Sequence, residues 1–122
     1  MNITLTKDIN GTLVPETRAA VVAAILEGKA ANAKRRHTGQ GGLLAFVRDY
    51  WHVLEPQTPF VTGWVLEAIC EHLEAVTRGD IKRLLINVPP GFCKSLLTDV
   101  FWPAWEWGPM NLSHKRYVTF SY

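Results

Sequence analysis

The chain has 122 residues, a hydrophobic content of 48% and a net charge of +2. This length allows one modest domain, and the hydrophobic content is normal for a globular protein and excludes general disorder. The small charge neither requires nor excludes a nucleic-acid partner. No apolar run reaches the length of a membrane span, and the N-terminus lacks the basic start and apolar core of a signal peptide, so we expect no membrane association.

Three helices are predicted before residue 80. The first opens at Pro15, a favourable first-turn residue, and ends in the basic run of residues 34–37. A flexible break at residues 38–42 precedes the second helix, which runs to about Val53. The third begins after Thr62 as its N-cap and ends at Gly79 as its C-cap. Each helix has apolar side chains at helical spacing and therefore a face to bury.

Two charged clusters on these helices have alternative interpretations. The basic run of residues 34–37 could contact DNA phosphates, but cations near a helix C-terminus also complement its dipole, and that interpretation is favoured. Glu67, Glu71 and Glu74 share one face of the third helix. Carboxylates at this spacing could hold a metal ion, yet a solvated helix face is far more common.

The second half of the chain predicts a parallel β-α-β unit. Residues 84–88 are apolar apart from Asn87, which suits a parallel strand buried on both faces. A helix follows and runs to about Trp102, because Pro103 should kink or end it. Residues 116–122 form the second strand, and this order implies a right-handed crossover. The predicted fold is α/β: N-terminal helices, then the first β-α-β unit of a P-loop NTPase parallel sheet, with the rest of that fold missing.

The junction between the first strand and its helix carries the strongest functional signal. Residues 89–95 read Pro-Pro-Gly-Phe-Cys-Lys-Ser. A turn at a helix N-terminus presents unpaired backbone N–H groups and the positive end of the helix dipole, and a polyphosphate satisfies both. Lys94, the candidate catalytic residue, would reach the β- and γ-phosphates of ATP, and the Ser95 hydroxyl would bind Mg²⁺. The residues expected around the phosphates are Pro90, Gly91, Phe92, Cys93, Lys94, Ser95 and Leu96.

The match to the usual P-loop pattern is incomplete. When G-x-x-x-x-G-K-[ST] is aligned on Lys94 and Ser95, its glycines fall on Val88 and Cys93. Only Gly91 remains to give the loop access to positive φ. The alternative is a Pro-Gly turn between a strand and a helix, with a solvated Lys94 and no ligand. These local residues alone do not separate the two interpretations.

Longer motifs surround the loop. They read Trp-His-Val-Leu-Glu-Pro at 51–56, Pro-Phe-Val-Thr-Gly-Trp at 59–64, Ala-Ile-Cys-Glu-His-Leu at 68–73, Leu-Ile-Asn-Val-Pro-Pro-Gly at 85–91 and Phe-Trp-Pro-Ala-Trp-Glu-Trp at 101–107. In this order and spacing, residues 43–122 resemble the start of the large terminase subunit of tailed bacteriophages, the ATPase that packages DNA into the capsid. Many members of that family carry a loop of the Pro-Pro-x-x-x-Lys-Ser kind.

The resemblance implies cofactors, partners and a domain division. The cofactors are ATP and Mg²⁺. The partners are double-stranded DNA, a portal protein and a small terminase subunit, in the cytoplasm of a bacterial host. Residues 1–41 would be an N-terminal arm, and residues 42–122 the N-terminal portion of a P-loop ATPase domain. Many members have Arg where Gly91 stands, serving as an arginine finger in cis, so another residue would have to stabilise the γ-phosphate here.

The sequence does not contain the acids that ATP hydrolysis requires. Hydrolysis needs one carboxylate to hold Mg²⁺ and another to position water, usually on a later strand. After Ser95 only Asp99 and Glu106 remain, and neither follows an apolar strand. In the terminase family the acidic pair lies further along, and a nuclease domain follows it. We therefore expect a fragment that turns over negligible ATP by itself. We also expect it to self-associate, because the missing neighbours of its sheet would leave apolar surface and unpaired edge groups exposed.

Two alternatives to a terminase fragment stay open. The first is another P-loop NTPase, such as a helicase-like motor, and the second is a non-catalytic prophage remnant or interaction module. The remaining residues predict no further site. Trp102, Trp105 and Trp107 could stack on bases, but no Lys or Arg interleaves with them, so core or subunit packing is favoured. The four histidines lack ligand spacing, and a disulfide between Cys70 and Cys93 is not expected.

Overall fold

The computed structural model of the chain describes residues 9–12, 15–39 and 41–120. The chain forms two compact units, residues 1–35 and 36–122, and the division falls within the first helix. The three predicted N-terminal helices are confirmed, and the second and third lie close to their predicted bounds. The helical elements are α1 (Pro15–Thr38), α2 (Gly42–Leu54), α3 (Trp64–Arg78), the π-helix η1 (Leu96–Phe101) and α4 (Trp102–Trp107).

The N-terminal unit contains most of α1, whose apolar side chains remain exposed. Val22, Ile25 and Leu26 are each more than half exposed. Alanine and other good helix formers make up much of this helix, so intrinsic propensity rather than burial accounts for its local stability. In the sequence, Val14 repeats at helical spacing with these residues, but it lies outside the described residues.

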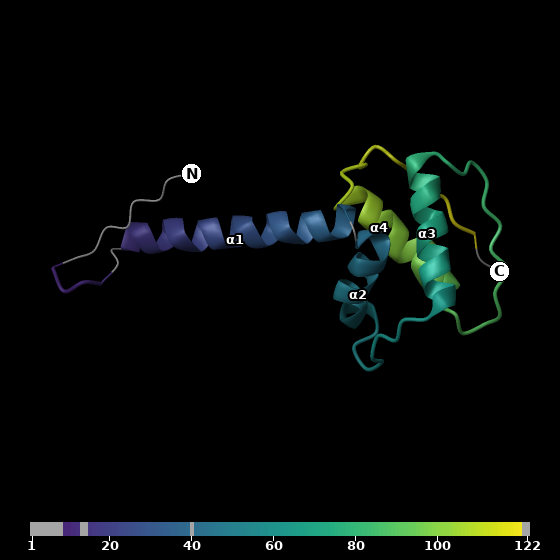
Figure 1. Ribbon diagram of the computed structural model, residues 1–122, viewed down its shortest axis with the longest axis horizontal. Coiled ribbons are helices and arrows are strands. Elements are labelled where there is room, and N and C mark those ends of the chain that lie inside the picture. Colours follow the sequence, from purple (N-terminus) through teal and green to yellow (C-terminus); the bar gives the residue numbers. More distant parts are fainter. Residues whose placement is uncertain (1–8, 13–14, 40, 121–122) are drawn as a thin grey trace. The chain divides into compact units, whose positions relative to one another are not determined.

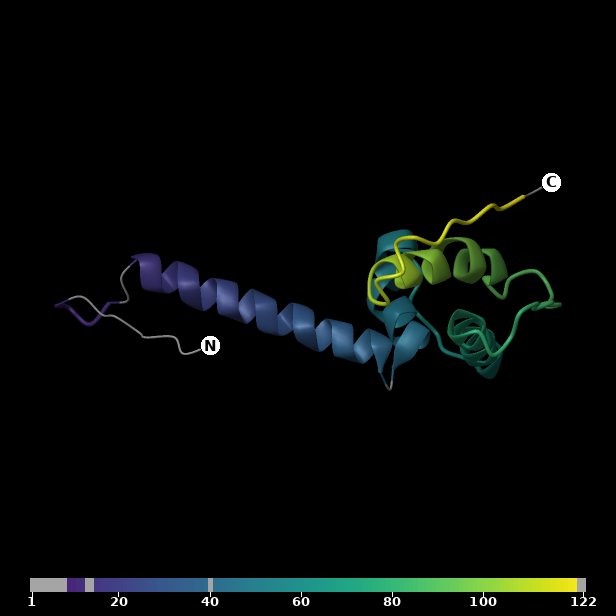
Figure 2. The same cartoon turned by 90° about the horizontal axis from the view of Figure 1, so that it is seen from above.

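The core of the C-terminal unit lies where α2 packs against α3, η1 and α4 (Figure 1). Seen from above, α3 is almost end-on and α4 runs past it (Figure 2). The rings of Trp51 and Phe101 stack in this core with centroids 6.1 Å apart and planes 7° apart. Burial stabilises the fold by about 1.5–3 kcal/mol for each large apolar side chain. The buried apolar residues are Leu43, Val47, Trp51, Ile69, Cys70, Leu73, Leu97, Phe101 and Trp105.

Polar contacts fix the ends of α2 and α3. Gly42 starts α2 with a φ of 49°, and the Leu43 N–H donates to Glu74 Oε1 on α3 at 2.7 Å. The favoured interpretation of a solvated acidic face is therefore wrong for Glu74, which is half-buried. Gly79 ends α3 at a φ of 88°, as predicted. Thr62 is not the N-cap: Gly63 holds that position, with no side-chain cap.

The predicted β-α-β unit is wrong, because none of the described residues forms a strand or a sheet. Residues 84–88 are extended, but Leu84, Ile86 and Val88 pack on the core while Leu85 is exposed, so only one face is buried. A strand also requires a hydrogen-bonded neighbour. Within the described part of the chain, the backbones of residues 84–88 and 116–120 form no hydrogen bonds. Apolar composition predicted the extended backbone but could not supply its partner.

The helix after the loop continues past Pro103, where a kink or an end was predicted. In a regular α-helix, proline lacks the N–H and its ring collides with the carbonyl four residues earlier. Here the six residues before Trp102 form the π-helix η1. At its end the Trp102 N–H donates a hydrogen bond to the Leu97 carbonyl. Because a π-helix has a wider turn, the carbonyl beside the Pro103 ring is a different one from that in an α-helix. The chain therefore continues as α4, with Gly108 as its C-cap.

Candidate phosphate-binding loop

The predicted loop turns sharply and then enters a helix. Residues 90–91 form the turn, and the helical backbone begins at Lys94, where the sequence places it. Gly91 has a φ of 94°, and Cys93, immediately before Lys94, has a φ of 53°. Alternating left-handed residues of this kind curve the backbone, so that successive N–H groups can line a concave anion site.

The loop has backbone donors to offer. The Leu97 N–H is the first to bond back, to the Cys93 carbonyl at 2.9 Å. Within the described residues, the backbone N–H groups of residues 91–96 donate no hydrogen bond. Cys93 has no side-chain oxygen that could cap the helix. The donors therefore remain free for an external anion, which the positive end of the helix dipole also favours.

The loop encloses a hollow of about 420 Å³, lined by residues 88–96. Lys94 and Ser95 are exposed, and their side chains form no ion pair or hydrogen bond with any described residue. Residues that could supply backbone donors, an ammonium and a hydroxyl to a polyphosphate all line this one hollow.

The carboxylates near the loop do not complete a hydrolytic site. Asp99 is exposed and accepts a hydrogen bond from Thr98 Oγ1 at 3.0 Å. Glu106 is fully buried and bonds to Thr77 and Lys115. No group of three or more His, Cys, Asp or Glu side chains among the described residues is placed to hold a metal ion. Mg²⁺ would therefore depend on Ser95 and on the phosphates themselves.

The aromatic and basic clusters have structural roles in the C-terminal unit. Trp105 is buried, and its Nε1 donates to the His37 carbonyl at 2.7 Å. The favoured packing role is thus confirmed for Trp105, whereas Trp107 is 47% exposed. Arg36 and His37 both bond to Asp49 of α2 rather than only facing a helix dipole. No sequence pattern indicates this contact, since the residues lie on different helices.

The two cysteines are free thiols in different environments. Cys70 is buried on the apolar side of α3. Burial, and then the negative charges of Glu74 and Glu71, raise the pKa of its thiol to about 12. Because the thiolate is the reactive form, Cys70 is chemically inert. Cys93 is half-buried within the loop.

No family model, no curated protein and no solved structure matches this chain. None of the helices among the described residues has the length and apolar character needed to cross a membrane. The functional assignment therefore depends on the geometry of the loop and on the motifs around it.

Proposed function

We propose that residues 90–96 bind the phosphates of ATP together with Mg²⁺, and that the chain is part of a DNA-packaging motor of the terminase large-subunit class. The loop geometry supports nucleotide binding, and the order of motifs over residues 43–122 supports the motor. In such a motor the partners are double-stranded DNA, a portal protein and a small terminase subunit, in the cytoplasm of a bacterial host.

The conformation of Cys93 is the observation that carries the nucleotide-binding proposal. The P-loop pattern has glycine immediately before its lysine. Here cysteine occupies that position and still adopts a φ of 53°. A residue with a Cβ takes up this conformation at a cost of about 1–2 kcal/mol. A simple connecting turn gives no reason for that cost, whereas a phosphate cradle does.

Each residue of the loop has a distinct role in this proposal. The backbone N–H groups hold the phosphate oxygens, Lys94 neutralises the β- and γ-phosphates, and the Ser95 hydroxyl binds Mg²⁺. Bound Mg²⁺ supplies charge neutralisation between the phosphates. No described carboxylate near the loop is positioned to orient water. We therefore expect binding with negligible steady-state phosphate release.

Isothermal titration calorimetry with ATP and Mg²⁺ tests nucleotide binding. Lys94→Ala should weaken binding at least tenfold, which is about 1.4 kcal/mol. Lys82→Ala is the matched control, because Lys82 is also exposed but lies outside the loop. Ser95→Ala should weaken the dependence of binding on Mg²⁺. Equal affinities for the wild type and Lys94→Ala would contradict the proposal.

The motor part of the proposal has its own test. The gene should encode, beyond residue 122, an apolar segment ending in Asp-Glu and then a carboxylate-rich nuclease domain. A different continuation would reject the terminase class and leave nucleotide binding by the loop unaffected.

A further inference from the structure

A buried polar network joins α3, α4 and the chain that follows α4. Glu106 is fully buried, and its Oε1 accepts hydrogen bonds from Thr77 Oγ1 at 2.5 Å and from Lys115 Nζ at 2.6 Å. The Trp102 Nε1 donates to the same Thr77 hydroxyl at 2.8 Å. The C-terminal segment thus contributes the Lys115 ammonium, and the other members of the network lie on α3 and α4.

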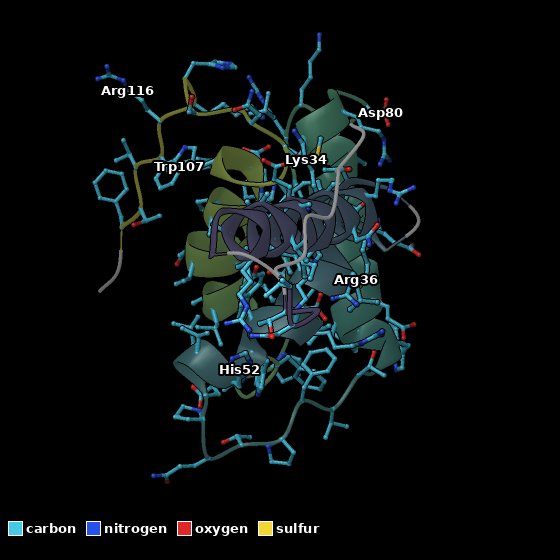
Figure 3. The ribbon with its side chains drawn as sticks, turned by 90° about the vertical axis from the view of Figure 1, so that its left-hand side faces the viewer. Lys34, Arg36, His52, Asp80, Trp107 and Arg116 are labelled. Atoms are coloured by element: carbon cyan, nitrogen blue, oxygen red, sulfur yellow. The ribbon has the colours of Figure 1, made fainter. Side chains whose placement is uncertain are left out.

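Few contacts hold that segment, residues 113–120, which we call the strap. The Trp107 Nε1 donates to the Lys115 carbonyl at 3.0 Å. The Tyr117 ring packs against Trp102 and Trp107, with centroid distances of 5.7 and 5.4 Å. Figure 3 shows Trp107 beside the strap, which carries Arg116. After Lys115 no described backbone group of the strap forms a hydrogen bond, so the side chains of Lys115 and Tyr117 are its main attachments.

Two polar atoms are buried where the strap meets α4, and neither has a partner among the described residues. They are Glu106 Oε2 and the Tyr117 hydroxyl. A buried polar atom without a hydrogen bond destabilises the closed arrangement, because it has lost water and gained nothing in return. The outward side chains Val118 and Phe120 are 78% and 94% exposed, so they do little to hold the strap down.

We propose that the strap is a latch poised to open. The ion pair between Lys115 and Glu106 closes it, and the two unpartnered atoms weaken the closed state. Lifting the strap would move Tyr117 away from both indoles and expose the Glu106 carboxylate to water. Because none of the buried apolar residues of the core lies in the strap, the strap would open locally while the core stays folded.

Exchange of the indole N–H groups, measured by NMR on the whole chain, tests the latch. The Trp107 N–H bonds to the strap and reports its opening, whereas the Trp105 N–H bonds to the His37 carbonyl in the core and reports unfolding. The Trp107 N–H should exchange much faster than that of Trp105. Equal rates would overturn the proposal, because the strap would then open only when the core unfolds.

Three variants make the test specific. Tyr117→Phe removes only the unpartnered hydroxyl and should slow Trp107 exchange about fivefold. Lys115→Met removes the ammonium that pairs with the buried carboxylate. This variant should accelerate exchange of the Trp107 N–H about tenfold. Arg116→Met changes a neighbouring exposed cation and should have no effect. An unchanged or faster rate in Tyr117→Phe would overturn the proposal, because the hydroxyl would then have a partner in the closed state.

Discussion

At the scale of single residues, three positions show how local conformation and charge set the properties of the C-terminal unit. Cys93 and Gly42 both have positive φ, in the loop and at the start of α2 respectively. Asp49 joins the end of α1 to α2 by bonding Arg36 and His37. Each position supports a prediction about stability that the sequence pattern alone does not contain.

Replacement of Cys93 measures the strain in the loop. Cys93→Val should lower the free energy of unfolding by about 1–3 kcal/mol, because a β-branched residue tolerates positive φ poorly. Cys93→Gly should unfold with a free energy no more than about 1 kcal/mol below that of the wild type. The relief of backbone strain stabilises this variant and offsets the greater conformational entropy of its unfolded chain. Urea unfolding of both variants checks the difference. If the two variants were equally stable, the strained conformation would not exist in solution.

Gly42 should tolerate no side chain. Its φ of 49° costs other residues about 1–2 kcal/mol, and a Cβ there would collide with the Glu74 carboxylate that accepts the Leu43 N–H. Gly42→Ala should therefore lower the free energy of unfolding by about 2 kcal/mol or more. Gly28→Ala in α1 is the control, because a Cβ there meets nothing within 4 Å. That variant should be neutral or gain up to about 1 kcal/mol, again by urea unfolding.

Asp49 should make the C-terminal unit sensitive to acid. Burial raises the pKa of Asp49, but hydrogen bonds from His37 and Arg36 and the charges of both outweigh burial, so its pKa lies below the usual 3.8. A carboxyl group with a depressed pKa stabilises the fold above its unfolded pKa and loses this contribution as the pH falls through its folded pKa.

Urea unfolding across a pH series tests this contribution. The stability of the wild type should decline from about pH 5 downward. Asp49→Asn should be less stable at neutral pH and flatter in the acidic window, so the two curves converge. Parallel curves would show that Asp49 contributes nothing to the acid response. Arg36→Gln removes one of the two partners of Asp49. Its stability curve against pH should therefore lie between those of the wild type and Asp49→Asn.

At the scale of elements, the sequence predicts what depends on local periodicity and misses what depends on partners. The apolar spacing was sufficient to predict α2 and α3, and Gly79 was sufficient to predict the end of α3, because each signal acts within one helix. The turn at Gly91 followed from the Pro-Gly pair, but the positive φ of Cys93 did not, because only Gly91 was expected to reach that region. The sheet was wrong because pairing needs a second segment. The π-helix was missed because the pattern around Pro103 indicates a break without showing how the preceding turn adapts.

Thr77 tests the connection between α3 and α4, which no sequence pattern revealed. Thr77→Val keeps the shape of the side chain but removes the hydroxyl that donates to Glu106 and accepts from Trp102. We expect the free energy of unfolding to fall by about 2–3 kcal/mol, because the buried Glu106 and the half-buried Trp102 each lose a hydrogen bond. Thr62→Val is the control, since its hydroxyl bonds only the exposed Glu67 side chain, and it should change stability by less than about 0.5 kcal/mol. Equal losses in the two variants would contradict the buried network.

At the scale of the whole molecule, apolar side chains in the C-terminal unit remain uncovered. Trp64 and Leu85 are 79% and 84% exposed, and both line a hollow of about 500 Å³ between α3 and the extended segment 84–89. Exposed apolar surface of this kind promotes association. The sequence predicted self-association from the unpaired edge of a sheet. Because the described residues form no sheet, these exposed apolar side chains are the surface that would have to drive association.

Substitutions at two adjacent residues of segment 84–89 distinguish an effect on association from an effect on folding. Leu85 points outward and Ile86 packs on the core. Light scattering over a concentration series should show self-association of the wild type and a marked decrease in Leu85→Lys, with the same free energy of unfolding, because the added charge is solvated. Ile86→Lys should instead unfold the protein, since it would bury an unpaired charge. A wild type that stays monomeric at every concentration would show that the exposed apolar face is too small to drive association.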